Sequence, residues 1–133
     1  MKILMIGHRG YVGPVAARHL ARALPGAEIH GIDAEWFAGS EAAAFPDAAF
    51  ASQRRADVRD LAEADFRGFD AVVALAAVSN DPIGKEFEDA TAEINSLAVL
   101  KAARAAKAAG VARFVFASSC SMYGAGADGL RKE

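Results

Sequence analysis

The first residues of the chain pair an apolar run with regularly spaced glycines. Lys2–Ile6 is almost continuously apolar, as expected of a strand buried on both faces of a parallel sheet. Gly7, Gly10 and Gly13 follow with the spacing G-x-x-G-x-x-G, and helical periodicity extends over residues 11–24. In a dinucleotide-binding turn, one glycine permits the tight turn, one lets the backbone approach a pyrophosphate, and one lets helix and strand pack closely. Because a buried strand precedes the glycines and a helix follows them, we predict a dinucleotide-binding turn rather than an ordinary glycine turn.

Beyond this turn, strand-like and helix-like segments alternate, which is typical of a parallel sheet covered by helices on both faces. We predict strands at 28–32, within 49–56, at 70–76 and at 113–117, helices at 60–66 and 87–109, and a loop or broken helix at 36–46. The expected apolar face of the first helix is Val12, Val15, Ala16, His19, Leu20 and Ala23. This spacing predicts an α/β doubly wound parallel sheet, a Rossmann fold of strand order 3-2-1-4-5. No repeat or linker divides the chain, so residues 1–133 are expected to form one domain.

Polar, acidic or glycine-rich residues follow every predicted strand. The ligand site of a doubly wound sheet lies outside the carboxyl ends of its strands, so these residues are expected to gather at one edge. In chain order they are residues 7–13, Asp33, Asp57, residues 79–81 and residues 118–121.

Asp33 ends the second predicted strand, twenty positions after Gly13. An acidic residue at this spacing accepts hydrogen bonds from a ribose diol, and its charge would repel a 2′-phosphate. The sequence therefore predicts NAD rather than NADP, with an ordinary turn or cap aspartate as the alternative. Arg9, inside the glycine turn, keeps NADP open because its side chain could meet a 2′-phosphate or simply flank the pyrophosphate.

Composition excludes several classes of function. The formal net charge is −2 and the basic residues are scattered singly, so nucleic-acid binding is not expected. The single cysteine, Cys120, allows no disulfide within the chain and no cysteine zinc cluster, so no metal site is expected. No apolar stretch is long enough to cross a bilayer, and we expect a cytoplasmic protein.

Six motifs occur in an order that resembles the extended short-chain dehydrogenase/reductase family. They are GHRGYVG at 7–13, GID at 31–33, ADVRD at 56–60, ALAAVSNDP at 74–82, EIN at 93–95 and GVARFVFASSCSMYG at 110–124. The chain is similar to the N-terminal, cofactor-binding portion of the NAD-dependent epimerases and dehydratases that act on nucleotide sugars. By this resemblance it lacks the family's later strands and substrate lobe. Ala74 stands where the family usually has histidine, at a mainly structural position.

The resemblance implies roles for the residues of these motifs. Asp57 and Val58 would contact the adenine, although Asp57 fits a helix N-cap equally well. Asn95 would order the wall of the site, or be an ordinary satisfied helical asparagine. The remaining implied cofactor-binding residues are Gly7, Arg9, Gly10, Tyr11, Val12, Gly13, Leu75, Ala76, Ala77 and Ser118.

Ser119 matches the family's catalytic serine or threonine, four residues before Tyr123. Its hydroxyl would hydrogen-bond the sugar oxygen that is oxidised or reduced. The family's Y-x-x-x-K acid/base motif follows neither Tyr11 nor Tyr123. Dehydratases of the family carry acidic residues directly after the serine or threonine, where this chain has Cys120 and Ser121. Epimerisation or ketoreduction is therefore expected rather than dehydration.

Three functions are consistent with these residues. The first is a nucleotide-sugar epimerase or ketoreductase that holds NAD, of which this chain carries the cofactor-binding part. The second is a catalytically inactive NAD(H)-binding or scaffolding protein, and the third is one half of a split enzyme. The resemblance also implies a homodimer formed through the long helix at 87–109, and it leaves the strand at 113–117 as an uncovered sheet edge.

Overall fold

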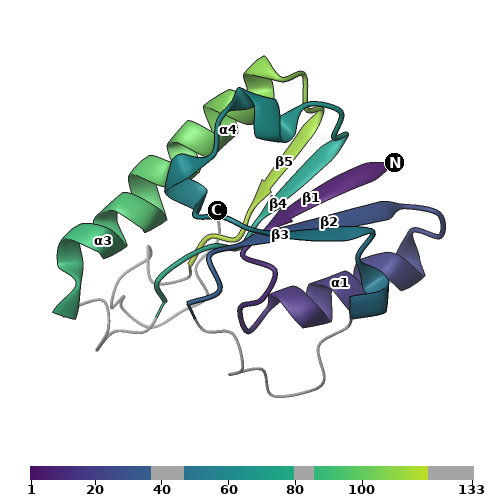
Figure 1. Cartoon of the computed structure of the whole chain (residues 1–133), viewed down its shortest axis with the longest axis horizontal. Helices are drawn as coiled ribbons and strands as arrows, with labels where there is room; N and C mark the ends of the chain where they lie inside the picture. Colours follow the sequence, from purple (N-terminus) through teal and green to yellow (C-terminus); the bar gives the residue numbers. More distant parts are fainter. Residues whose placement is uncertain (37–46, 80–85, 120–133) are drawn as a thin grey trace, which may run out of the picture.

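The computed structural model describes residues 1–36, 47–79 and 86–119, and shows a parallel sheet of five strands (Figure 1). The strand order is β3-β2-β1-β4-β5, which confirms the predicted Rossmann-like fold. The predictions for residues 37–46, and for Asn80, Asp81, Cys120, Ser121 and Tyr123, lie outside the described residues. The strands are β1 (Lys2–Ile6), β2 (Glu28–Asp33), β3 (Ser52–Arg55), β4 (Ala71–Ala74) and β5 (Arg113–Phe116).

Helices cover the two faces of the sheet (Figure 1). One face packs against α1 (Gly13–Ala23) and the 3-10 turn η1 (Asp47–Ala49), around a small core of Met5, Ala17 and Ile29. The other face packs against α3 (Glu88–Ala92), the π-helical η4 (Glu93–Ala98) and α4 (Val99–Ala108), which run on from one another. The larger core lies on this second face and includes Leu4, Ile6, Leu61, Phe66, Val72, Ile94 and Ala102. In the described part of the chain, no helix is long and apolar enough to span a membrane.

The helix predicted at 60–66 is wrong, because two 3-10 turns, η2 (Val58–Asp60) and η3 (Glu63–Phe66), stand in its place. Leu61 and Ala62 between them have extended backbone. This break lets Leu61 and Phe66, 1% and 0% exposed, both enter the larger core. Burial of two large apolar side chains outweighs the weak helical propensity of a seven-residue segment.

The long helix predicted at 87–109 is present, but its middle is a π-helix rather than an α-helix. A π-turn widens the helix by one residue per turn and is common at functional sites. Here the π-turn carries Ile94, which lines the pocket described below, and Asn95, which holds the lining residue Val78 in place.

The buried face of α1 agrees with the predicted one only in part, since Ala16 and Leu20 pack against the smaller core as expected. The helix begins at Gly13, two residues later than expected, and buries Gly13, Pro14 and Ala17. Val12 and Val15 are 54% and 64% exposed. The side of α1 that carries the small buried residues therefore packs inward, and Gly13 lies directly against the preceding loop.

In the described part of the chain, β3 and β5 form the edges of the sheet. β3 reads Ser-Gln-Arg-Arg, and charged side chains of this kind discourage pairing with another strand. β5 has no such protection, as expected from the sequence, since Val115 and Phe116 are 56% and 47% exposed.

Candidate functional site

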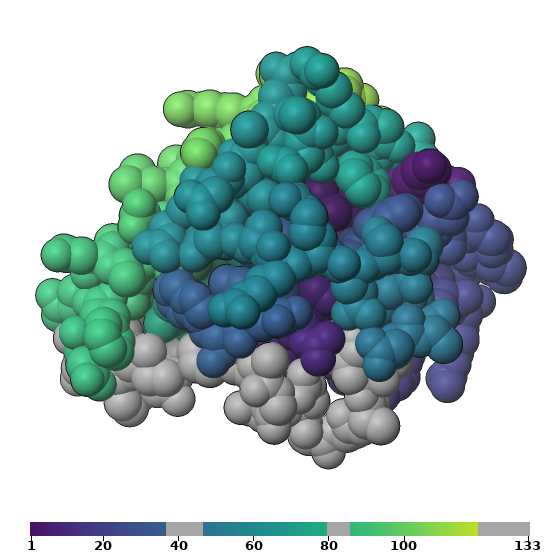
Figure 2. Space-filling model, in the orientation of Figure 1, coloured from purple at the N-terminus to yellow at the C-terminus, as the bar shows by residue number. Residues whose placement is uncertain are grey.

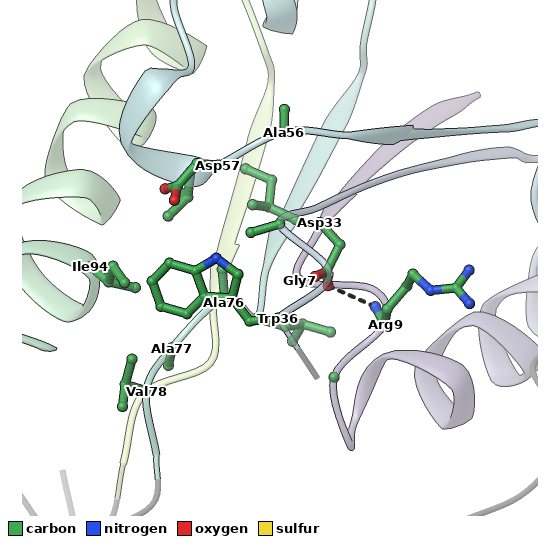
Figure 3. Close-up of a pocket in the computed structure, with 15 residues that line it drawn as sticks. Gly7, Arg9, Asp33, Trp36, Ala56, Asp57, Ala76, Ala77, Val78 and Ile94 are labelled. Carbon is green, nitrogen blue, oxygen red and sulfur yellow. Dashed lines mark hydrogen bonds between the residues drawn. The ribbon is translucent and has the colours of Figure 1, made fainter. Parts of the chain in front are cut away.

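A pocket of about 90 Å³ lies at the carboxyl ends of the strands, where the chain order reverses between β1 and β4 (Figure 3). This is the place at which doubly wound sheets bind ligands. Five separate segments supply its lining. The lining residues are Ile6, Gly7, Arg9, Gly10, Asp33, Ala34, Trp36, Ala56, Asp57, Val58, Leu75, Ala76, Ala77, Val78 and Ile94.

The glycine loop between β1 and α1 is held so tightly that two of its glycines admit no side chain. Gly7 has a φ of +83°, and a Cβ there would lie 2.5 Å from the backbone nitrogen of Ala76. A Cβ on Gly13 would lie 2.0 Å from the carbonyl oxygen of His8. Gly10 has more space, because a Cβ there would meet only the oxygen of Gly7, at 3.4 Å.

The loop leaves the first turn of α1 without a side-chain cap. Val12 is the N-cap residue, and its side chain makes no capping hydrogen bond to the N–H groups of the first turn. An uncapped helix N-terminus beside a glycine loop presents N–H donors and a positive partial charge, which suit a phosphate group.

The buried side chain of His8 anchors the glycine loop to the sheet. The sequence did not predict this role. Its ring is 1% exposed and packs so closely over Gly31 that a Cβ there would lie 2.5 Å from it. The ring also meets Phe50 edge-on, with 5.0 Å between the ring centroids. Gln53 Nε2 donates to Asp47 Oδ1 at 2.9 Å, which turns Gln53 Oε1 toward His8 Nε2, also at 2.9 Å.

Asp33 joins the glycine loop to the end of β2. Its Oδ2 accepts a hydrogen bond from the backbone N–H of Arg9 at 2.9 Å, drawn as a dashed line in Figure 3. Its Oδ1 accepts from the N–H of Glu35 at 2.7 Å. The Arg9 side chain extends away from the pocket, with Nε 4.0 Å from Glu35 Oε1 and Nη1 3.4 Å from Gln53 Oε1.

Asp57 is the N-cap of η2, which confirms one of the two roles considered for it. Its Oδ1 accepts from the N–H of Arg59 at 2.9 Å. The Arg59 guanidinium donates back to both carboxylate oxygens, with Nε to Oδ1 at 3.0 Å and Nη2 to Oδ2 at 2.7 Å. These side-chain hydrogen bonds, more than the opposing effect of burial, hold the pKa of Asp57 below its usual value.

The Asp57–Arg59 pair predicts a pH-dependent contribution to stability. Because the folded pKa of Asp57 is lowered, its contribution to stability is complete above the ordinary aspartate pKa of 3.8 and disappears as the pH falls through the folded pKa. Asp57→Asn keeps a capping oxygen but loses the charge. We expect it to lower the free energy of unfolding by about 1 kcal/mol at neutral pH, and by progressively less below about pH 4. Urea titrations at several pH values measure this difference, and a constant difference throughout would contradict the assignment.

Asn95, on the π-turn, holds the chain that follows β4. Its Oδ1 accepts from the N–H of Val78 at 2.8 Å, and its Nδ2 donates to the carbonyl of the same residue at 2.9 Å. The side chain does not line the pocket but fixes Val78, which does.

Asn95→Ala is expected to lower the free energy of unfolding by about 1–3 kcal/mol. It leaves the N–H and C=O of Val78, a residue 8% exposed, without their partners. Asn95→Asp is the matched comparison, since a carboxylate can still accept from the N–H but cannot donate to the carbonyl. We expect a loss for both variants in chemical denaturation, and unchanged stability in Asn95→Ala would refute the bracing role.

The predicted site residues fall into three groups. Gly13 and Asn95 do not line the pocket but hold the loop and chain segments that do. Gly7, Arg9, Gly10, Asp33, Asp57, Val58, Leu75, Ala76 and Ala77 line the pocket. Tyr11 and Val12 are exposed, and Ser118 and Ser119 lie exposed just after β5, outside the pocket lining. Among the residues that the structure describes, no group of His, Cys, Asp or Glu side chains could hold a metal ion.

Sequence reasoning missed Trp36, whose indole lies across the pocket (Figure 3). It follows the strand-end carboxylate of Asp33 by three positions, and an aromatic residue so close to a predicted ribose ligand was the available signal. On the face seen in Figure 2, the chain after β2 (blue) lies against the segment after β3 (teal), with the glycine loop (purple) beside them.

The sequence profile described as "NAD dependent epimerase/dehydratase family" matches residues 3–133. A comparison with curated proteins finds no significant match. Many solved structures resemble the chain, and three show the range of their ligands. MoeE5, solved in complex with UDP-glucose and NAD, is 26% identical over 98% of this chain and 40% of its own, with a TM-score of 0.78.

The other two structures also contain bound NAD. A short-chain dehydrogenase/reductase superfamily protein from Agrobacterium tumefaciens, with bound NAD, is 27% identical over 93% of this chain and 34% of its own, with a TM-score of 0.71. DesIV, a dTDP-glucose 4,6-dehydratase from Streptomyces venezuelae with NAD bound, is 27% identical over 86% of this chain and 38% of its own, also with a TM-score of 0.71. The chain thus spans 34% to 40% of the length of these three proteins.

Proposed function

Since the chain belongs to the NAD-dependent epimerase/dehydratase family, we propose that it binds NAD(H) as the cofactor-binding portion of a nucleotide-sugar epimerase or ketoreductase. The observation that carries the proposal is the position of Asp33. Its carboxylate stands at the carboxyl end of β2 and is hydrogen-bonded to the glycine loop, beside a pocket at the reversal of strand order. A ribose diol and a pyrophosphate need these two elements side by side.

Each element of the pocket has a proposed role in holding the cofactor. The glycine loop and the backbone N–H groups of Tyr11, Val12 and Gly13 at the start of α1 would bind the pyrophosphate. Asp33 would accept hydrogen bonds from the adenosine ribose, and Asp57 and Val58 would lie against the adenine. The backbone and small side chains of Leu75, Ala76 and Ala77 would line the cleft.

The charges around Asp33 support NAD over NADP. A 2′-phosphate would meet the carboxylates of Asp33 and Glu35 at the end of β2. Arg9, the one nearby cation considered for a 2′-phosphate, lies 4.0 Å from Glu35 and also reaches Gln53. The positive charge of the Arg9 guanidinium is therefore already placed beside Glu35 and Gln53 rather than held for a 2′-phosphate.

The proposed chemistry belongs to the whole protein of which these residues form the cofactor-binding part. NAD⁺ would supply the acceptor for a hydride from a sugar carbon. Ser119 would donate its hydroxyl hydrogen bond to the sugar oxygen at that carbon, and Ser118 would lie beside the cofactor. Cys120 and Ser121 are not acids, which supports epimerisation or ketoreduction over dehydration.

We also propose that the protein forms a homodimer through its long helix. Leu97 and Leu100, on η4 and α4, are 65% and 53% exposed. Apolar side chains exposed on one helical segment favour a second helix as their partner.

Isothermal titration calorimetry of the 133-residue chain with NAD⁺ tests the proposed function directly. We expect one NAD⁺ per chain and weaker binding of NADP⁺. Absence of binding by either dinucleotide, in a chain whose circular dichroism shows it to be folded, would overturn the proposal.

A further inference from the structure

Trp36 has an unusual setting for the only tryptophan of the chain. Its indole is 51% exposed, yet it lies across the pocket opposite Ile94, Ala77 and Val78 (Figure 3). The backbone directs it there, because Glu35 has a φ of +62°, a left-handed conformation uncommon outside glycine. The N–H of Glu35 is held by Asp33 Oδ1 in the same turn. The turn that places the ribose ligand therefore also places the indole.

Arg59 gives the indole a rigid neighbour. Its guanidinium carbon lies 5.5 Å from the centroid of the Trp36 ring, within the range of a cation–π contact. Arg59 Nη1 also donates to Glu93 Oε2 at 3.0 Å, in addition to the two bonds to Asp57. Carboxylates from two different elements thus fix the guanidinium, so the indole rests against a group that is already ordered.

The opposite wall of the pocket is apolar and made of small side chains. Ala76, Ala77, Val78 and Ile94 line it, and Asn95 braces its backbone at Val78. The space between this wall and the indole is part of a pocket of about 90 Å³. An enclosed apolar cavity that admits benzene measures about 150 Å³, so the present space is too small to surround a purine, and the half-exposed indole is the side of it that can shift.

We propose that Trp36 is the residue that recognises the adenine of the cofactor. The indole moves away from the alanine and valine wall as the base enters, and then covers the face of the base that this wall does not touch. The purine is then held between a fixed apolar wall and an aromatic ring, an arrangement that stabilises any flat aromatic base. This inference rests on the proposed NAD(H) site, and adds to it a residue that holds the adenine half by stacking.

The two halves of NAD⁺ separate this role from general cofactor binding. Because Trp36 is the sole tryptophan, tryptophan fluorescence reports on this pocket alone. The indole is excited at the red edge of its absorption band, where adenine does not absorb. We expect AMP and ADP-ribose to change the emission of the folded chain saturably. Nicotinamide mononucleotide, which has no adenine, is expected to leave it unchanged.

Substitutions give the second measurement. Trp36→Ala is expected to weaken binding of NAD⁺ and of AMP about tenfold in calorimetry, and Trp36→Phe to restore most of the affinity. Phe87→Ala is the matched control, since Phe87 is 53% exposed, lies just before α3 and does not line the pocket. Circular dichroism checks that each variant is folded. We expect the Trp36 variants to fold, because the side chain is half exposed.

The outcomes distinguish this inference from the proposed function. If the wild-type chain binds NAD⁺, but Trp36→Ala binds it equally well and AMP leaves the emission unchanged, the role of Trp36 is refuted and the cofactor site stands. If the wild-type chain binds neither NAD⁺ nor AMP, the proposed function fails and this inference fails with it. Weaker binding by Trp36→Ala, with Phe87→Ala unchanged, supports both.

Discussion

Gly13→Ala is expected to lower the free energy of unfolding by about 3 kcal/mol or more, or to prevent folding altogether. The added Cβ would lie 2.0 Å from the carbonyl oxygen of His8 and 2.5 Å from its carbonyl carbon. These are backbone atoms, so no side-chain rotation relieves the clash. Relief would require α1 to move away from the sheet, or the loop to release His8 from Gln53 and Gly31. Urea denaturation followed by far-ultraviolet circular dichroism measures the loss.

Gly10→Ala is the matched control, because it makes the same chemical change three residues earlier in the same loop. Its Cβ would meet only the oxygen of Gly7 at 3.4 Å, an ordinary contact. We expect its stability to change by less than about 1 kcal/mol, since alanine also reduces the freedom of the unfolded chain. Its binding of NAD⁺ should nevertheless weaken, because the new methyl group faces the pocket that Gly10 lines. Equal destabilisation by the two substitutions would contradict the geometry of the loop.

The strand order could be predicted from the sequence because each strand is short and followed by a recognisable signal, and because every strand except the charged edge strand β3 contains apolar side chains. The glycines after β1 and the aspartates at or after β2 and β3 mark the carboxyl edge of a parallel sheet. The structure differs where tertiary packing decides the local geometry. Leu61 and Phe66 divide one predicted helix into two turns so that both can be buried. Ala16 and Leu20 of the predicted apolar face of α1 pack on the core, but Val12 and Val15 are exposed.

The site residues that stand at or directly after the ends of strands could also be predicted. Gly7, Gly10, Asp33 and Asp57 line one pocket, as their positions after successive strands imply. The contacts of His8 could not be predicted, because they depend on the register between strands. Gly31 pairs with Gln53 across β2 and β3, and this pairing brings the amide of Gln53 beside the imidazole of His8.

Trp36 escaped prediction for a different reason. Its placement depends on one backbone dihedral, the positive φ of Glu35, at a residue type that seldom adopts it. Glutamate gives no sign in the sequence that the chain turns back there. Glycine or asparagine at the same position would have indicated the turn.

Asp33→Ala is expected to weaken NAD⁺ binding about 100-fold, the loss that corresponds to two hydrogen bonds to a charged acceptor. Part of this effect arises in the free chain, where Asp33 already accepts from the N–H groups of Arg9 and Glu35. Removing the carboxylate loses one of the hydrogen bonds that tie the glycine loop to the end of β2 as well as removing the ribose ligand. Calorimetric titration of wild type and variant with NAD⁺ and NADP⁺ measures both affinity and preference.

Asp33→Asn removes the negative charge of the side chain but keeps part of its hydrogen bonding, so it separates the two contributions. The amide oxygen can still accept from one of the two N–H groups, but the amide nitrogen cannot accept from the other, and the repulsion of a 2′-phosphate disappears. We therefore expect Asp33→Asn to bind NAD⁺ with an affinity between those of wild type and Asp33→Ala, and to lose most of the preference for NAD⁺ over NADP⁺. A wild-type chain that binds the two cofactors equally, with neither substitution changing the ratio, would show that Asp33 does not face the ribose. The carboxylate would then serve only to join the loop to the strand.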